Sequence, residues 1–140
     1  MAYTHTAWDP NLATGHALID NQHRQLIASV NDLFDAYQSG KGREEVERTM
    51  DFLVAYTVKH FGDEEKLQEQ YGYPHYLVHK QIHAEFKDVA QHLLNSLYHD
   101  GPTDAFISRV CATIGQWVVN HIKSDDQKMT VYIRSREQSG

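Results

Sequence analysis

The chain has 140 residues, of which 41% are hydrophobic and 23% are charged, as is usual for a single soluble globular domain. Its 13 basic and 19 acidic residues give a net charge of −6, which argues against nucleic acid as a partner because that partner requires a basic face. One cysteine, Cys111, excludes an internal disulfide and a thiolate metal cluster, so we expect it to pack as a small core thiol.

The predicted elements begin with an extended N-terminal arm over residues 1–17, which contains Pro10 and Gly15 and lacks sustained apolar periodicity. An apolar stripe then predicts a helix at about 19–38, which the glycines of "QSGKG" end. A second helix is predicted at about 43–71, because its inward stripe alternates steps of four and three residues. That stripe consists of Val46, Met50, Leu53, Thr57, His60, Glu64, Leu67 and Tyr71.

Two further helices complete the predicted fold. One is expected at about 74–98 with Pro74 in its first turn, and the other at about 104–124 with Thr103 or Asp104 as its N-cap. The residues beyond are expected to form a C-terminal tail. Four helices with short connections pack as an antiparallel up-down bundle, so we expect one all-α domain over residues 1–140.

The sequence gives no indication of a membrane protein. No apolar run approaches the roughly 20 residues of a membrane span, and no signal peptide is recognisable. We therefore expect a cytoplasmic location.

Each predicted inward stripe carries side chains that could bind a metal, namely His23, His60, Glu64, His79, His83 and His121. A single histidine on an apolar face is more often a core residue than a ligand. Counting from the shared turns at about 1.5 Å per residue, however, places all of these side chains in one layer of the bundle. Buried imidazoles and carboxylates need compensation, which metal ions supply. The nitrogen-rich set suits iron, zinc, copper or nickel, and its size favours two metals over one four-coordinate zinc.

The segments "WDPNLATGHALIDNQHRQLI", "YTVKHFGDEEKLQEQYGYP", "HKQIHAEF" and "WVVNHIKSDDQK" resemble the hemerythrin family in its bacterial form. The resemblance covers nearly the whole chain, and the ordered series H, HxxxE, HxxxH and HxxxxD is highly specific. It implies two iron ions bridged by Glu64, Asp126 and a solvent-derived oxo or hydroxo group. It also implies that one iron is bound by His79, His83 and His121, and the other by His23 and His60.

The implied ligand set leaves one coordination position open on the iron with two histidines. The resemblance therefore implies reversible dioxygen binding, for carriage, storage or sensing, by a protein that is not an enzyme. Azide and nitric oxide are expected as alternative ligands. Met129 stands where the family usually carries an aromatic residue.

The spacing after His121 leaves two acidic residues open as ligands. Regular helical geometry favours Asp125, because the fifth residue, Asp126, is rotated by about 140° off the face. The family pattern implies Asp126, and a local loosening of the helix could accommodate it. We expect Asp126 to be the ligand, and likewise Glu64 rather than Glu65.

A set of apolar residues near these positions is expected to line the dioxygen pocket, with core packing as their other role: Leu26, Ile27, Phe61, Trp117, Val118 and Ile122. A dry lining limits proton transfer, which favours release of dioxygen over its reduction. The other histidines are expected at the surface or at helix edges: His5, His16, His75, His92 and His99.

Two other functions stay open at this point. One is a di-iron oxidase or peroxidase, acting on nitric oxide or peroxide, although the ligands differ from the four-glutamate, two-histidine set of such enzymes. The other is an oxygen- or iron-sensing regulatory module. Nothing resembling a signalling module is present, and the sequence indicates no protein partner.

Overall fold

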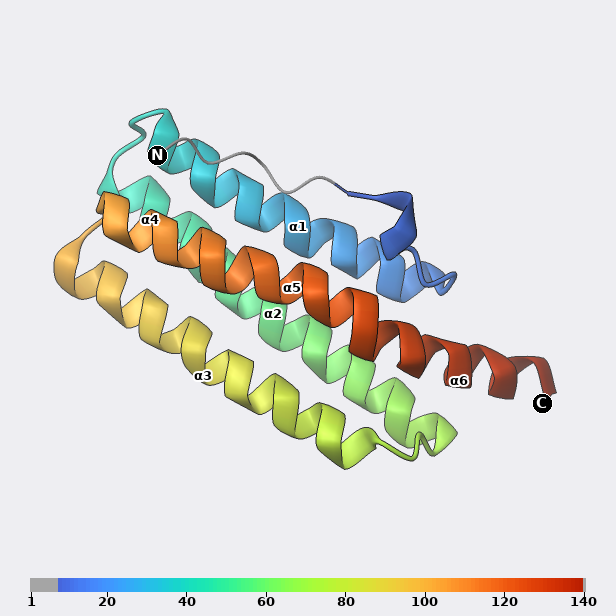
Figure 1. The fold of residues 1–140 in the computed structure, drawn as a ribbon. Coiled ribbons are helices and arrows are strands. Elements are labelled where there is room, and N and C mark those ends of the chain that lie inside the picture. The colour runs from blue at the N-terminus through green and yellow to red at the C-terminus, as the bar shows by residue number, and fades with distance from the viewer. Residues whose placement is uncertain (1–7, 140) are drawn as a thin grey trace.

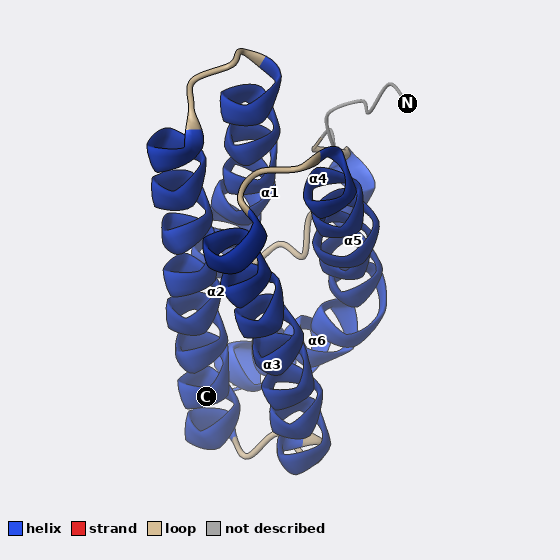
Figure 2. Ribbon diagram, turned by 90° about the vertical axis from the view of Figure 1, so that its left-hand side faces the viewer, coloured by secondary structure: helices blue, strands red, loops and turns tan. Residues whose placement is uncertain are grey.

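Four long helical segments lie side by side in the computed structural model, which describes residues 8–139 (Figure 1). The first three are α1 (Ala17–Gln38), α2 (Arg43–Tyr71) and α3 (Tyr76–Asp100). The fourth consists of α4 (Asp104–Val110), α5 (Gln116–His121) and α6 (Gln127–Ser139), joined by π-helical segments at Cys111–Gly115 and Ile122–Asp126. Residues 8–139 contain no strand, and successive segments run in opposite directions (Figure 2). The expected up-down four-helix bundle is confirmed.

The turn between α2 and α3 shows why the third helix begins later than expected. Gly72 follows α2 with a left-handed φ of 64°, which suits glycine. The Tyr76 amide then donates to the Tyr73 carbonyl at 3.1 Å, which puts Pro74 at the second position of a turn, where proline is favoured. α3 therefore begins at Tyr76 rather than at 74, and it ends at Asp100 rather than at 98.

The segment expected to be a C-terminal tail is helical, so that expectation is wrong. The fourth segment continues without a loop through Ile122–Asp126 into α6 (Figure 1). Met129 and Ile133, four residues apart, are fully buried and pack with Ile19 and Tyr73. This pair continues the apolar periodicity of the helix, so the sequence contained the signal.

The described part of the N-terminal arm is anchored on the bundle, whereas residues 1–7, with His5, lie outside the described residues. Pro10–Leu12 form a 3₁₀ turn, and Leu12 is buried in the main core. The Gln127 side chain donates to the carbonyls of Leu12 and Ala13, at 3.2 Å each. The arm is thereby held against the start of α6.

Two apolar clusters fill the bundle and flank its polar layer. The larger contains Met50, Leu53 and Leu97 at the end where α1 joins α2 and α3 joins α4. It also buries Cys111, as expected. The smaller, around Met129, fills the end where α2 joins α3. Within residues 8–139, no helix is both long enough and apolar enough to cross a membrane.

Thr103 offers a test of how the last segment begins. Its hydroxyl accepts a hydrogen bond from the Phe106 amide at 3.0 Å, which caps α4. Thr103→Ala should lower the free energy of unfolding by about 1 kcal/mol, because the amide loses this partner. Urea unfolding followed by circular dichroism measures the loss. Thr103→Ser keeps a hydroxyl and serves as the control, so an equal loss in both variants would contradict the capping role.

Candidate metal centre

Five imidazoles and two carboxylates from all four helical segments converge on the polar layer of the bundle. All seven residues are buried, with at most 5% of their surface exposed. Their ligand atoms form two groups, and within each group the atoms lie within 4.8 Å of one another. The first group is Glu64, His79, His83, His121 and Asp126; the second is His23, His60, Glu64 and Asp126. Glu64 and Asp126 belong to both groups.

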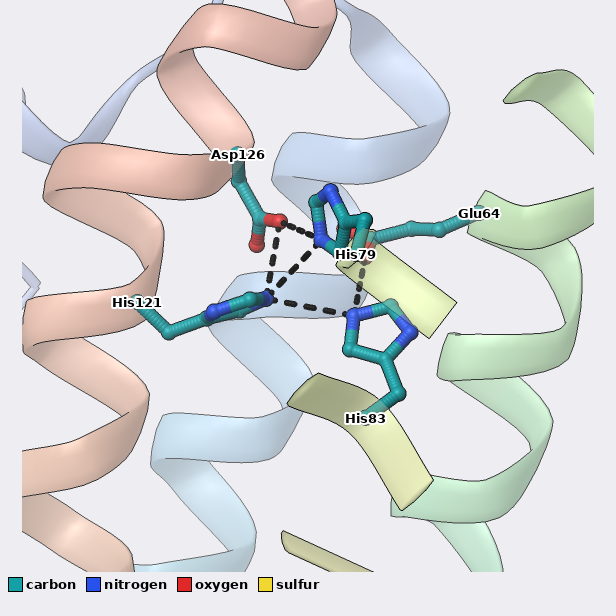
Figure 3. Close-up of side chains that lie close together, drawn as sticks. All are labelled: Glu64, His79, His83, His121 and Asp126. Atoms are coloured by element: carbon teal, nitrogen blue, oxygen red, sulfur yellow. Dashed lines mark hydrogen bonds and ion pairs between the residues drawn. The ribbon is translucent and has the colours of Figure 1, made fainter. Parts of the chain in front are cut away.

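The first group gathers three imidazole nitrogens around one point (Figure 3). His121 Nε2 lies 3.1 Å from both His79 Nε2 and His83 Nε2. Asp126 Oδ1 lies 3.1 Å from the Nε2 atoms of His79 and His121, and Glu64 Oε1 lies 3.2 Å from His83 Nε2. Two nitrogens bound at right angles to one metal, at about 2.1 Å each, would lie roughly 3 Å apart. The observed nitrogen separations fit that arrangement.

The second group uses the other oxygen of each carboxylate. His60 Nε2 lies 3.0 Å from Glu64 Oε2, and His23 Nε2 lies 2.9 Å from Asp126 Oδ2 and 3.3 Å from Glu64 Oε2. Each carboxylate thus directs one oxygen toward each group of histidines. Two carboxylates that bridge a pair of metal ions would have this orientation.

The carboxylate oxygens are close to nitrogens without being aligned to them. Among the described residues, Glu64 Oε1 and both Asp126 oxygens are buried and accept no hydrogen bond of good geometry. Unsatisfied carboxylate oxygens are costly in a core. These side chains point at shared positions between them rather than at one another. Ligands of a bound cation have this arrangement, so this set of donor atoms fits a metal site.

A local change of helix type brings Asp126 into the layer. The segment Ile122–Asp126 is π-helical, and its wider turn lets a residue five positions after His121 share the same face. Asp125 instead lies outside the layer, where its carboxylate contacts His121 Nδ1 at 2.9 Å. The structure therefore contains the expected loosening, whereas the role of Asp126 as a ligand stays a prediction.

The ionisable groups of the layer shift one another's pKa values toward the charged forms. Burial alone would lower the pKa of His23, but its close contact with Asp126, its hydrogen bond to Glu64 and the negative charge of both carboxylates outweigh burial and raise that pKa to about 9. Burial alone would raise the pKa of Glu64, but the surrounding histidines, with His60 first, hold it well below its usual range. Metal ions bound here would replace protons as the compensating charge.

The predicted dioxygen-pocket residues form the wall of the larger apolar cluster next to the layer. Leu26, Ile27, Phe61, Val118 and Ile122 are buried and Trp117 is partly buried. Phe61 stacks on the ring of His83 with centroids 3.8 Å apart, and Trp117 stacks on His121 at 4.3 Å. The two aromatic rings thereby fix the orientation of two imidazoles of the first group.

Sequence reasoning missed several polar residues that support the layer. Gln22, one residue before His23, contacts His60 Nδ1, and Glu65 contacts His83 Nδ1 in the same way. Gln68 is fully buried one turn beyond Glu64 and donates to Met129 Sδ at 2.7 Å. The periodicity of α2 had favoured the neighbouring Leu67, although the four-residue step from Glu64 also points to Gln68.

The remaining described histidines lie away from the layer. His16 is partly buried, and its side chain accepts a hydrogen bond from the Ile19 amide at the start of α1. The others, His75, His92 and His99, are exposed.

Known proteins resemble this chain in both sequence and fold. Residues 14–133 match the hemerythrin HHE cation binding domain. The bacteriohemerythrin of Pseudomonas aeruginosa is 34% identical over 123 residues, which cover 87% of this chain and 77% of that protein. The bacteriohemerythrin of Stenotrophomonas maltophilia is 36% identical over 121 residues, with coverage of 86% and 76%.

The crystal structure of a leucine-to-tyrosine variant of hemerythrin superimposes with a TM-score of 0.80 at 26% identity. It covers 91% of this chain and 96% of that chain. The sequence match spans most of the bundle and includes every residue of the layer described above. The chain belongs to the hemerythrin family.

Proposed function

We propose that this protein binds dioxygen reversibly at a non-haem centre of two iron ions. The observation that carries the proposal is the pair of ligand groups that share Glu64 and Asp126. One carboxylate oxygen of each residue faces each group, so a pair of metals can be held together without any further acidic ligand.

The two groups differ in their number of nitrogen ligands. His79, His83 and His121 would hold one iron, and His23 and His60 the other. With both carboxylates and an oxo or hydroxo bridge added, the first iron would have six ligands and the second would have five. The second iron would thus keep one position for dioxygen, and a pair of irons would supply the reversible two-electron chemistry that this binding requires.

The protein's own residues favour release over reduction of dioxygen. Leu26, Ile27 and Ile122 are at most 4% exposed and present only hydrocarbon. A lining without acidic protons limits proton transfer to the bound gas and keeps water from the open position. The histidine-rich ligands also differ from the carboxylate-rich set of di-iron oxidases.

The first expectation is two irons per chain. Protein produced with iron should contain close to two equivalents by metal analysis. His23→Ala should lower this toward one, because the second iron would lose one of its two nitrogens. His92→Ala removes an exposed histidine and should leave two. A native protein with one equivalent, or with zinc alone, would rule out the di-iron centre.

The two neighbouring aspartates should differ in their effect on iron content. Asp126→Asn should reduce bound iron, because it removes the charge of a buried carboxylate that directs one oxygen to each group. Asp125→Asn should retain two irons per chain, because Asp125 contacts only the outer nitrogen of His121 in this layer. Metal analysis of both variants decides the matter, and the opposite pattern would show that the ligand assignment is wrong.

Function itself is tested by optical spectra of the reduced protein. A visible absorption band should appear in air and disappear when dioxygen is removed, with no reductant consumed. Azide should compete for the same position once the irons are oxidised. Sustained consumption of dioxygen or peroxide, without a detectable oxygenated form, would contradict reversible binding and favour a di-iron oxidase or peroxidase.

A further inference from the structure

Two imidazoles of the three-histidine group have carboxylates on their outer nitrogens. His83 Nδ1 lies 3.0 Å from Glu65 Oε2, and His121 Nδ1 lies 2.9 Å from Asp125 Oδ2. An ionised carboxylate only accepts hydrogen bonds, so each Nδ1 carries the proton. The lone pair of each Nε2 therefore points into the layer.

The two-histidine group has a different set of outer partners. His60 Nδ1 lies 2.7 Å from Gln22 Oε1. The orientation of this amide is fixed because Gln22 Nε2 donates to Asp63 Oδ2 at 2.7 Å, and Lys59 lies 2.9 Å from the same oxygen. His60 thus contacts a neutral amide whose own carboxylate partner is paired with a cation. Among the described residues, His23 Nδ1 has no hydrogen-bond partner.

This asymmetry has an electronic consequence. A carboxylate that accepts from a metal-bound imidazole raises the basicity of that ligand, and a more basic ligand favours the higher oxidation state of its metal. A neutral amide has a weaker effect. Glu65 has a side chain that is 14% exposed, whereas that of Asp125 is 35% exposed. Solvent screens the charge of Glu65 less, so its influence is the greater.

We propose that Glu65 and Asp125 are positioning residues that make the metal of the three-histidine group the more tightly bound and the more readily oxidised of the two. They would act through His83 and His121 and would not touch the metal. The proposal rests on the two-metal centre proposed above. It adds that the two metals differ in affinity and in ease of oxidation, and that residues outside the ligand set cause this difference.

The test replaces each carboxylate by its amide, which keeps an oxygen for Nδ1–H but removes the charge. In the iron-loaded protein, Glu65→Gln should weaken the preference for the ferric state by roughly tenfold, which raises the first midpoint potential by about 59 mV for one electron. Asp125→Asn should shift it in the same direction by less. A redox titration followed by absorbance measures both shifts.

Two further variants separate this role from a general effect of charge or folding. Glu69→Gln makes the same change of charge on α2 at an exposed carboxylate that accepts from the Tyr76 hydroxyl, and it should leave the potentials unchanged. Gln22→Glu brings a carboxylate to His60, so it should lower the second midpoint potential and narrow the gap between the two steps. This variant adds a charged partner for His60, although it also removes the hydrogen bond that Gln22 donates to Asp63.

A titration of the metal-free protein with Co²⁺ gives a readout that does not depend on iron or dioxygen. Two binding steps are expected, and Glu65→Gln should weaken the tighter one by about tenfold. The role of Glu65 and Asp125 is overturned if Glu65→Gln and Gln22→Glu both bind two metals per chain with the same potentials and Co²⁺ affinities as Glu69→Gln. The di-iron proposal stands in that case. A native protein that binds one metal overturns both.

Discussion

Two negative charges in the centre of a helical bundle are the constraint that organises this molecule. Glu64 and Asp126 are at most 1% exposed, and an isolated carboxylate in such a place costs several kcal/mol. All four helical segments direct imidazoles at the two carboxylates, which offsets this cost. The positive charge can be carried by protons on His23 and His121, whose pKa values are raised, or by bound metal ions. The layer is thus stable only with a compensating cation.

The up-down topology gives this layer its position. Antiparallel helices with short turns keep corresponding residues at the same level, so side chains distant in sequence meet without long connections. Apolar clusters on both sides seal the layer, the larger one around Met50 and the smaller one around Met129. Regular helices would still have left Asp126 off the site. The π-helical turn before α6 corrects this, as such irregularities often do at functional positions.

The orientation of the imidazoles is fixed from two directions. From the apolar side, Phe61 and Trp117 stack on His83 and His121 with interplanar angles of 4° and 15°. From the outer side, carboxylates and an amide fix which ring nitrogen carries the proton. Rings held in this way need little rearrangement on binding a metal. The site is therefore preorganised by packing as well as by hydrogen bonds.

The sequence by itself determined the four-helix fold and placed the five histidines and Glu64 in one layer. Apolar periodicity defines four helices, and residue counts from the turns place His23, His60 and His121 at one level, because helical rise is regular. Only the tertiary structure decided features that depend on departures from regularity or on contacts across helices. The π-helical turn, which turns Asp126 inward and Asp125 outward, follows from the packing of the whole segment. The contact between Gln22 and His60 joins residues 38 positions apart, and no local pattern encodes it.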